Sequence, residues 1–513
     1  MSQLPTTAPG NTDTVFPPGR QLRVACLSYS EVLAQSVSVI APSTIPAAVL
    51  GLIFAKAGNA TCLSFVLGML GLVLVSHNIN QFARRSASPG SLYSYLIKGL
   101  TPTAGILGGW ALLFGYALTG MSTLCGLALS ANVILRQLLG IELPIVVLFA
   151  IGSLASFCIA FRDIQLSAKT MLLFEGASLL LVLFLGLVIW ATKGFKLDTA
   201  QLTLSGSTPS GALSGVGLVV FGFSGFESAT ALGDEAKAPL RTIPRAVVQS
   251  VVLTGAFFTV MAFVIVFGFD KQPALLATSE APLNVLAASV GWSELGALLN
   301  IGILLSFFSC TLASINSAAR ILFTMAQHGL IADALGEAHA VNRTPHVAVA
   351  VTALFTCLAP CALHIAGISV FDCQGHFGTL CSFGFIVVYI LISLAAPHYL
   401  ASIGKLDRRA IANSIGGVVF MALPVIGTIG IPGSQVLPLA SGSSRILIGV
   451  FAAYMLAGFG WLLLQRARRP KLISEMQSSI DTVHWKFAHG ASQIVPSIGS
   501  PSDPTPPPVG YSI

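Results

Sequence analysis

The residues best placed for chemistry are a carboxylate and two glycines inside an apolar stretch. From Gly217 to Arg245 the chain reads GLVVFGFSGFESATALGDEAKAPLRTIPR, where Gly222 and Gly225 stand just before Glu227. A carboxylate at bilayer depth is expensive unless it faces a cavity, a partner or a pathway. The glycines let the backbone unwind, which is tolerated at that depth only around a substrate or inside protein. This pattern indicates a transporter.

A second break is expected in the string IAPSTIP, residues 40–46, where Pro42 and Pro46 lie four positions apart. Each proline lacks an N–H and clashes with the preceding turn of a helix. A simple kink is one interpretation, because proline is common in transmembrane helices. A functional break is the other, because interrupted first and sixth helices hold corresponding places in two five-helix halves. That correspondence predicts an inverted repeat with its site at the midplane.

Glu175, in SAKTMLLFEGASLLLVL, is the other carboxylate in mid-span. Burial favours the neutral form of a carboxyl group, so such a group could take up a proton in one conformation and release it in another. We therefore expect Glu227, and with it Glu175, to couple transport to protons. The alternative for Glu175 is a protonated side chain that only bonds a neighbouring helix.

Small polar residues concentrate in the stretch 306–316, which contains Ser306, Ser309, Cys310, Thr311, Ser314 and Asn316. Their hydroxyls could coordinate sodium against the first helix, but such residues also hold helices together in lipid. Packing is the interpretation we favour, so H⁺ is expected before Na⁺ as the coupling ion.

Motifs for metal binding or catalysis are incomplete. Cys357, Cys361 and His364 precede Asp372, Cys373 and His376, but no rigid loop is expected to arrange them as metal ligands. The nucleophile elbow fails because Phe226 stands at its second glycine. No HExxH motif, phosphate-binding loop or complete dinucleotide fingerprint occurs. We therefore expect no enzyme, no bound metal and no cofactor.

Composition points the same way. The 513 residues are 54% hydrophobic and 9% charged, whereas soluble domains carry about 25% charged residues. The net charge of +7 does not indicate nucleic-acid binding, because the basic residues lie between the apolar runs. The expected surroundings are a lipid bilayer.

Windows of about 20 residues predict an all-α membrane protein with about 12 transmembrane helices. The expected spans are 30–54, 58–80, 92–132, 143–161, 168–191, 211–234, 243–268, 294–325, 347–366, 375–396, 412–432 and 446–465. The expected organisation is a disordered cytoplasmic N-terminus (1–24), a first repeat (25–200), a second repeat (205–400), two further helices (405–468) and a cytoplasmic Pro/Ser-rich tail (469–513).

The distribution of Lys and Arg predicts the orientation. If the N-terminus is cytoplasmic, the only basic residues on the other side are Lys56, Arg136, Lys193, Lys196, Lys271 and Arg445. This bias fits the positive-inside rule and places both termini in the cytoplasm. A plasma or inner membrane is the expected location. The nine cysteines lie mostly in expected helices, which favours buried packing residues over disulfides.

Three segments together carry a family resemblance. They are the sixth-span string GFSGFESA with the following KAPLRTIPRA, the string SPGSLYSYLIKGLTPTAGILGGWALLFGY from Ser88 to Tyr116, and Asn316 to Val349, with NSAARILFTMAQHGLIADALG and RTPHVAV. The chain resembles the amino acid-polyamine-organocation permeases over nearly all of spans 1 to 10. It departs from them at Gln327-His328, where the family usually has a basic and an acidic residue, and at Ala41-Pro42-Ser43, which replaces Gly-Ser-Gly.

The resemblance implies a LeuT-type 5+5 inverted repeat with two added helices and a substrate site at the breaks. A substrate carboxylate would be met by amides after Ala41, around Ser43, Thr44 and Ile45, where the helix dipole is positive. The ammonium would be held by carbonyls near Ile40, Phe221 and Gly222. The side-chain pocket would be walled by Phe221, Phe223 and Phe226, although Phe223 could equally be lipid-facing packing.

The expected function is secondary active transport of an amino acid, by proton coupling or exchange. A neutral substrate is favoured, because no basic residue lies deep in the spans that would form the site. The alternatives are an amine or polyamine permease of the same fold and an amino acid sensor that does not transport.

Overall fold

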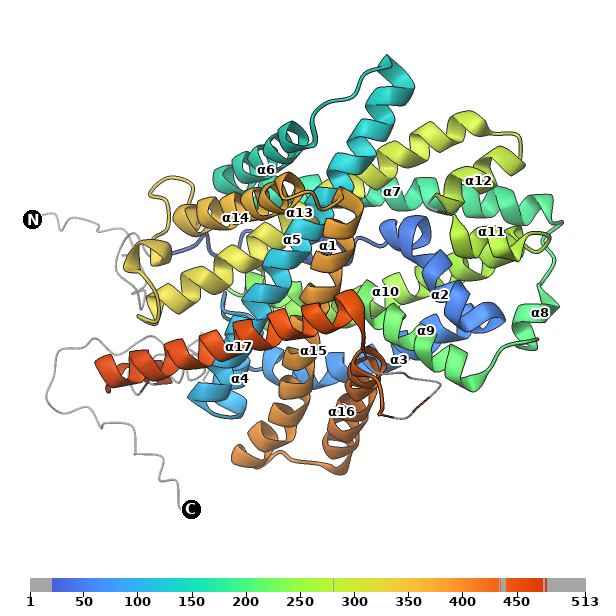
Figure 1. The fold of residues 1–513 in the computed structure, drawn as a ribbon. Helices are drawn as coiled ribbons and strands as arrows, with labels where there is room; N and C mark the ends of the chain where they lie inside the picture. The colour runs from blue at the N-terminus through green and yellow to red at the C-terminus, as the bar shows by residue number, and fades with distance from the viewer. Residues whose placement is uncertain (1–20, 280, 433, 435–439, 474–475, 478–513) are drawn as a thin grey trace, which may run out of the picture.

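The computed structural model describes residues 21–477 except 280, 433, 435–439 and 474–475 (Figure 1). In this part of the chain every regular element is a helix, and one isolated parallel β-bridge joins Leu27 to Ala236. Of the ends expected to be disordered, residues 1–20 and 478–513 lie outside the described residues. The expected all-helical class is confirmed.

The helices follow one another along the chain with short connections. Their bounds are α1 Tyr29–Ile40, η1 Ile45–Val49, α2 Leu50–Ala57, η2 Gly58–Ala60, α3 Thr61–Ala83, α4 Leu92–Gly99, α5 Pro102–Leu139, α6 Ile145–Arg162, α7 Ile164–Thr192, α8 Thr199–Leu202, α9 Pro209–Gly222, η3 Ser228–Leu232, α10 Pro239–Gly268, α11 Pro273–Thr278, α12 Pro282–Ser289, α13 Ser293–Gln327, η4 Asp333–Gly336, α14 His346–Ile365, α15 Val370–Ser402, α16 Arg408–Ile429 and α17 Gly442–Arg468.

Ten stretches of the described chain are long and apolar enough to cross a membrane. The first, Tyr29–Ala83, contains two expected crossings, and the broken sixth crossing, α9 with η3, is too short to be among the ten. With the second crossing inside the first stretch and the interrupted sixth segment, this agrees with the about 12 crossings expected from window length. The chain is a multi-pass integral membrane protein.

The third expected span, 92–132, is wrong at its start. The structure divides it into the short helix α4 and the long helix α5. Thr101 caps α5 by accepting the Ala104 amide at 3.2 Å, and Pro102 occupies the first helical position. A proline is favourable there but cannot continue the preceding helix, so the chain turns between α4 and α5.

Helix packing repeats between the two halves. The pairs α5–α15 and α13–α7 join spans 3 to 10 and 8 to 5, and the pairs α1–α10 and α9–α3 join spans 1 to 7 and 6 to 2. Exchanging each span for its counterpart five places away in the other half turns the pair of spans 3 and 10 into the pair 8 and 5. The same exchange turns the pair 1 and 7 into the pair 6 and 2. Because five is odd, the two halves cross the membrane in opposite directions, as an inverted repeat requires.

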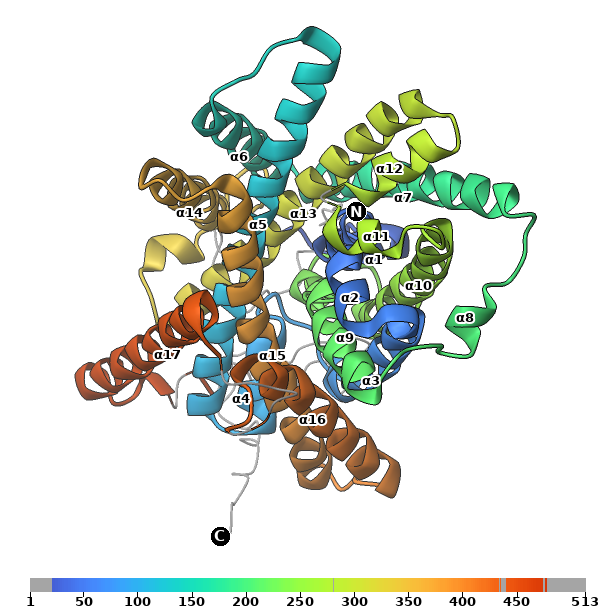
Figure 2. The ribbon, with the colours of Figure 1, turned by 45° about the vertical axis from the view of Figure 1, so that its right-hand side comes forward.

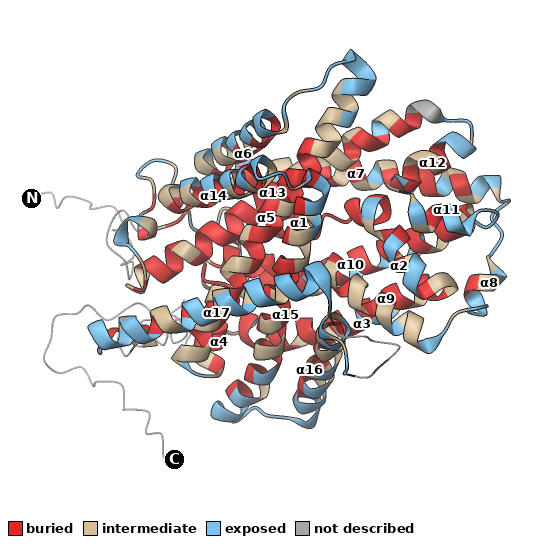
Figure 3. Cartoon of the chain, in the orientation of Figure 1, coloured by how far each residue is buried: buried red, intermediate tan, exposed pale blue. Residues whose placement is uncertain are grey.

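Burial separates the inner helices from the outer ones. The colouring in Figure 3 shows many buried residues on α1, α5, α13 and α15, whereas α17 is largely exposed. Both views show α16 and α17 at the periphery (Figures 1 and 2). α17 is held to α5 by Trp110 and Tyr454, whose side chains each bond the other's backbone carbonyl at 3.2 and 3.1 Å.

The contact between α5 and α15 generates the first prediction. A Cβ atom at Gly384 would lie 2.5 Å from the Ala111 carbonyl oxygen, and backbone cannot move aside as a side chain can. We expect Gly384→Val to cost about 3 kcal/mol or more through overpacking. The midpoint of thermal unfolding and the yield of monodisperse protein should both fall.

Gly375→Val is the matched control, because it makes the same change on α15 at a position with no atom within 4 Å. Equal stability of the two variants would show that α5 and α15 do not pack this closely.

Candidate functional site

The first break lies where the sequence predicts it. α1 ends at Ile40, Ala41 takes a left-handed φ of 49°, and the chain becomes helical again only at Ile45. A left-handed conformation costs an alanine about 1–2 kcal/mol, so the surrounding contacts must enforce it. Thr44 does so in part, since its amide and its hydroxyl both donate to the Ala41 carbonyl, at 3.0 and 2.8 Å.

The second break lies beside the first. α9 ends at Gly222, and Gly225 has a φ of +86°, which favours glycine. A Cβ atom at Gly225 would lie 2.2 Å from Val39 Cγ1, and one at Gly222 would lie 3.1 Å from Ile45 Cδ1. The expected site residues Ile40, Ala41, Ser43, Thr44, Ile45 and Gly222 are all buried at this junction.

Glu227 is fully buried just after the second break and is held by two tyrosines. The Tyr116 hydroxyl of α5 donates to one carboxyl oxygen at 2.7 Å, and the Tyr389 hydroxyl of α15 donates to the other at 2.5 Å. Tyr389 also accepts the Gly225 amide at 3.0 Å. Glu227 therefore ties the broken sixth span to α5 and α15.

Hydrogen bonds extend from Glu227 to the first span. Tyr116 contacts Ser317 of α13, and the Gln35 side chain of α1 donates to Ser317 Oγ at 3.0 Å and to the Ala313 carbonyl at 2.8 Å. The Ser228 hydroxyl donates to the Gln35 carbonyl at 3.2 Å. With Tyr389 of α15, the groups around Glu227 thus form one network across five spans.

Glu175 occupies a separate position at the first break. The Ser306 hydroxyl of α13 donates to its carboxyl oxygens at 2.9 and 3.1 Å. The carboxyl group also lies near the backbone amide of Ser43, whereas the buried Ser43 hydroxyl has no hydrogen-bond partner among the described residues. Glu175 does bond a neighbouring helix, as the simpler interpretation requires, but it also reaches the broken backbone.

The other polar residues of α13 bond to neighbouring helices, as packing residues do. Ser309 Oγ donates to Ser38 Oγ at 2.8 Å, and Cys310 Sγ donates to the Val39 carbonyl at 3.1 Å. Thr311 bonds Thr123 of α5 at 2.9 Å.

The phenylalanines of the sixth span face different partners. Phe223 is fully buried, so the expected lipid-facing alternative is wrong, and its ring packs edge-on against Phe258 of α10 with ring centroids 5.0 Å apart. Phe226 packs against Tyr389 at 5.0 Å, and Phe221 is half-buried. A ring that the sequence analysis missed, Phe385 of α15, lies 3.7 Å from the Cβ position of Gly225.

Tyr116 and Tyr389 were also missed, although a signal existed. A phenol buried in an apolar span needs an acceptor for its hydroxyl, so mid-span tyrosines point to a buried polar group such as Glu227.

The cysteines near Cys357 and Cys373 do not form a metal site. Among the described residues, no group of three or more His, Cys, Asp or Glu side chains could hold a metal ion. All nine cysteines are free thiols.

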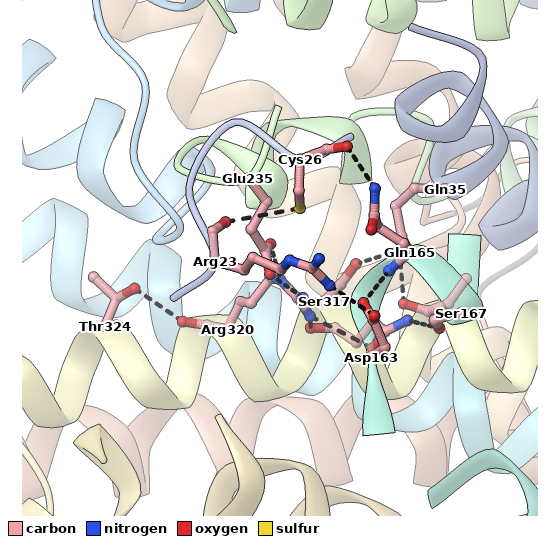
Figure 4. A network of polar contacts seen from close by, with 12 residues as sticks. Arg23, Cys26, Gln35, Asp163, Gln165, Ser167, Glu235, Ser317, Arg320 and Thr324 are labelled. Atoms are coloured by element: carbon pink, nitrogen blue, oxygen red, sulfur yellow. Dashed lines mark hydrogen bonds and ion pairs between the residues drawn. The ribbon is translucent and has the colours of Figure 1, made fainter. Parts of the chain in front are cut away.

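The face that carries the first described residues is closed by polar contacts, and we call it the N-terminal face (Figure 4). The Ala25 amide donates to the Asp234 carbonyl at 3.0 Å, and the Cys26 and Leu27 amides donate to the Glu235 carbonyl at 2.8 Å. The segment before α1 is thereby fastened to the segment after η3.

A buried ion pair lies beneath these backbone contacts. Arg320 of α13 donates to both carboxyl oxygens of Glu235 at 2.7 and 2.8 Å, and the two side chains are 1% and 0% exposed. Arg23 pairs with Asp163 at 2.7 Å nearer the surface, and Gln165 donates to the Cys26 carbonyl at 2.9 Å. Figure 4 shows these groups meeting from four segments of the chain.

The family model for amino acid permeases matches residues 36–459. The branched-chain amino acid permeases BcaP of Bacillus subtilis (strain 168) and Lactococcus lactis subsp. cremoris (strain MG1363) are 25% and 26% identical, over 57% and 56% of this chain. These alignments span 65% of the length of each relative, just under two thirds.

Two more distant similarities complete the comparison. The Arabidopsis thaliana protein named cationic amino acid transporter 3, mitochondrial, is 22% identical over 72% of this chain and 63% of its own. A solved Na⁺-coupled sialic acid symporter in a substrate-bound outward-open state is 15% identical, with a TM-score of 0.45, over 79% of this chain and 91% of its own.

The tyrosine contacts of Glu227 generate the second prediction. Removing the Tyr389 hydroxyl leaves a buried carboxyl oxygen without its donor, so we expect Tyr389→Phe to cost about 1–3 kcal/mol of stability. In a double-mutant cycle with Glu227→Gln, measured by unfolding in detergent, the two changes should be non-additive by about 1 kcal/mol.

Tyr454→Phe provides the control cycle with Glu227→Gln. The Tyr454 hydroxyl bonds the Trp110 carbonyl instead, so these changes should be additive within about 0.5 kcal/mol. Additivity in both cycles would contradict an energetic contact between Tyr389 and Glu227.

Proposed function

Because the chain belongs to the amino acid permease family, we propose that it is a secondary transporter that moves amino acids across the membrane by alternating access. The observation that carries the proposal is the contact between the two breaks, Val39 with Gly225 and Ile45 with Gly222. Non-helical backbone buried at this depth offers amides and carbonyls to a zwitterion, which needs both.

The substrate carboxylate is assigned to the first break. Of the expected amides, that of Thr44 already donates to Ala41, so Ser43 and Ile45 are the better candidates. The ammonium is assigned to carbonyls near Ile40, Phe221 and Gly222. Phe226, Phe221 and the newly placed Phe385 are the proposed walls for the substrate side chain, and Phe223 is left to packing.

Proton coupling is assigned first to Glu175. Its carboxyl group interacts with the Ser43 amide, which is the group that a substrate carboxylate would need. Protonation removes the negative charge of Glu175 and weakens its hold on that amide, so proton and substrate bind together. Glu227 has a donor on each oxygen, which suits a carboxylate that keeps its charge and links the helices.

A neutral substrate is favoured by the state of these carboxylates. A cationic side chain would need an acidic partner, and Glu175 and Glu227 are already engaged by hydroxyl groups. The second candidate, a cationic amino acid or amine, is kept because both carboxylates lie beside the breaks. A non-transporting amino acid sensor of the same fold is the third, and it predicts binding without flux.

The N-terminal face is proposed to lie in the cytoplasm of a plasma or inner membrane. Arg23, Lys237 and Arg320 lie on this face, whereas Lys56 and Lys193 lie at the opposite ends of their spans. This distribution supports the orientation that the positive-inside rule predicts.

The third prediction tests the function directly. Purified protein should be stabilised against heat by leucine, alanine or phenylalanine more than by glutamate or arginine. The same ligands should show saturable, competable flux into proteoliposomes. Only a solute that binds can shift the protein between its outward-open and inward-open states.

Ser43→Pro removes a proposed carboxylate-binding amide and should abolish both effects, whereas Ser443→Ala, in an exposed part of α17, should leave them unchanged. Stabilisation by a polyamine or a dicarboxylate alone would contradict the proposed substrate class. Binding without flux would favour the sensor.

The fourth prediction concerns Glu175. Flux into proteoliposomes should rise when the outside is made acidic, because inward proton flow adds to the driving force. Glu175→Gln keeps a group that accepts from Ser306 but cannot change charge, so it should bind substrate while its flux becomes independent of an imposed pH gradient.

Glu227→Gln is the comparison, and it should lower flux at all pH values without removing the response to pH. Flux in the wild type that follows a sodium gradient and ignores a pH gradient would contradict proton coupling and favour the α13 hydroxyls.

A further inference from the structure

Described residues beyond α17 are buried against the N-terminal face. Leu472 and Met476 are 6% and 2% exposed. Leu472 Cδ1 lies 3.2 Å from the Cβ position of Gly329, and Arg469 donates to the Gly329 carbonyl at 3.4 Å. We call Arg469, Leu472 and Met476 the C-terminal clasp.

The clasp meets a polar socket formed by Tyr93 of α4 and His328. The Tyr93 hydroxyl lies 2.8 Å from His328 Nδ1 and 3.3 Å from Met476 Sδ. A phenol has one hydrogen, so both contacts are satisfied when His328 donates to Tyr93 and Tyr93 donates to the sulfur. Desolvation lowers the pKa of His328 to about 4, which keeps the ring neutral near pH 7.

A neutral imidazole suits this buried position, because His328 can hydrogen-bond Tyr93 without placing a charge beside the apolar side chains of the clasp.

The loop before α4 connects the socket to the closed N-terminal face. Ser91 bonds Thr230 of η3 at 2.5 Å, and a Cβ atom at Gly233 would lie 2.3 Å from the Ser88 amide nitrogen. A Cβ atom at Gly90 would lie 2.9 Å from Thr324 of α13. The loop is therefore wedged between the end of the sixth span and α13, next to the buried Arg320.

From these contacts we propose that the C-terminal clasp is a regulatory element that holds the N-terminal face closed. Its side chains fix Tyr93, and with it the loop that braces η3 against α13. Release of the clasp frees this loop, and the backbone bonds between residues 25–27 and 234–235 then open more often. The proposal rests on these contacts and not on the identity of any substrate.

Hydrogen–deuterium exchange of the full-length protein in detergent tests the proposal. The amides of Ala25, Cys26 and Leu27 are donors in the closed face, so their exchange rate measures its opening. In Leu472→Ala/Met476→Ala this rate should rise about tenfold, because exchange follows local opening. Tyr93→Phe, which removes only the hydroxyl, should also raise the exchange rate of these amides.

Leu464→Ala is the matched control, since it removes the same atoms as Leu472→Ala from a leucine of α17 that is 59% exposed. Its exchange at residues 25–27 should equal that of the wild type. A wild-type rate in the double variant would overturn the proposal. Equal acceleration in a peptide from the α5–α15 contact would also overturn it, because it would show a general loss of stability.

Discussion

Non-helical backbone inside an apolar protein must find partners for its amides and carbonyls, and this constraint organises the buried polar groups. At the first break Thr44 satisfies the Ala41 carbonyl twice, and at the second Tyr389 accepts the Gly225 amide. Tyr116 of α5 and Tyr389 of α15 bond Glu227 just after the second break, and Ser306 of α13 bonds Glu175.

Each break has its own carboxylate, and the two are held differently. Glu227 lies between hydroxyl groups of α5 and α15, so movement of the sixth span must carry or break two hydrogen bonds. Glu175 projects from α7 and meets Ser306 and the Ser43 backbone. One carboxylate thus belongs to a helix that surrounds the site and the other to a segment that unwinds within it. This difference is the basis for proposing Glu175 as the group that changes charge and Glu227 as the group that links the helices.

The sequence was sufficient for features with local causes. Prolines at 42 and 46, glycines at 222 and 225 and the isolated Glu227 are signals within a few residues, and both breaks occur where they indicate. Tyr116, Tyr389 and Phe385 could not be assigned in this way, because ordinary aromatic residues acquire a role only when distant helices pack. The boundary at Thr101-Pro102 carried a local signal, but continuous hydropathy concealed it.

The closed N-terminal face is stabilised by a pair of charges whose separation would be costly. Arg320 and Glu235 are almost fully buried, and an unpaired charge at such a place costs about 3–5 kcal/mol. A partly opened face would carry that cost without hydration, whereas a fully opened one would let water reach both groups. Intermediate openings are therefore disfavoured relative to the two end states. For the alternating access proposed above, a buried ion pair at this position would favour two discrete states, because a protein open to both sides of the membrane at once would leak the solute.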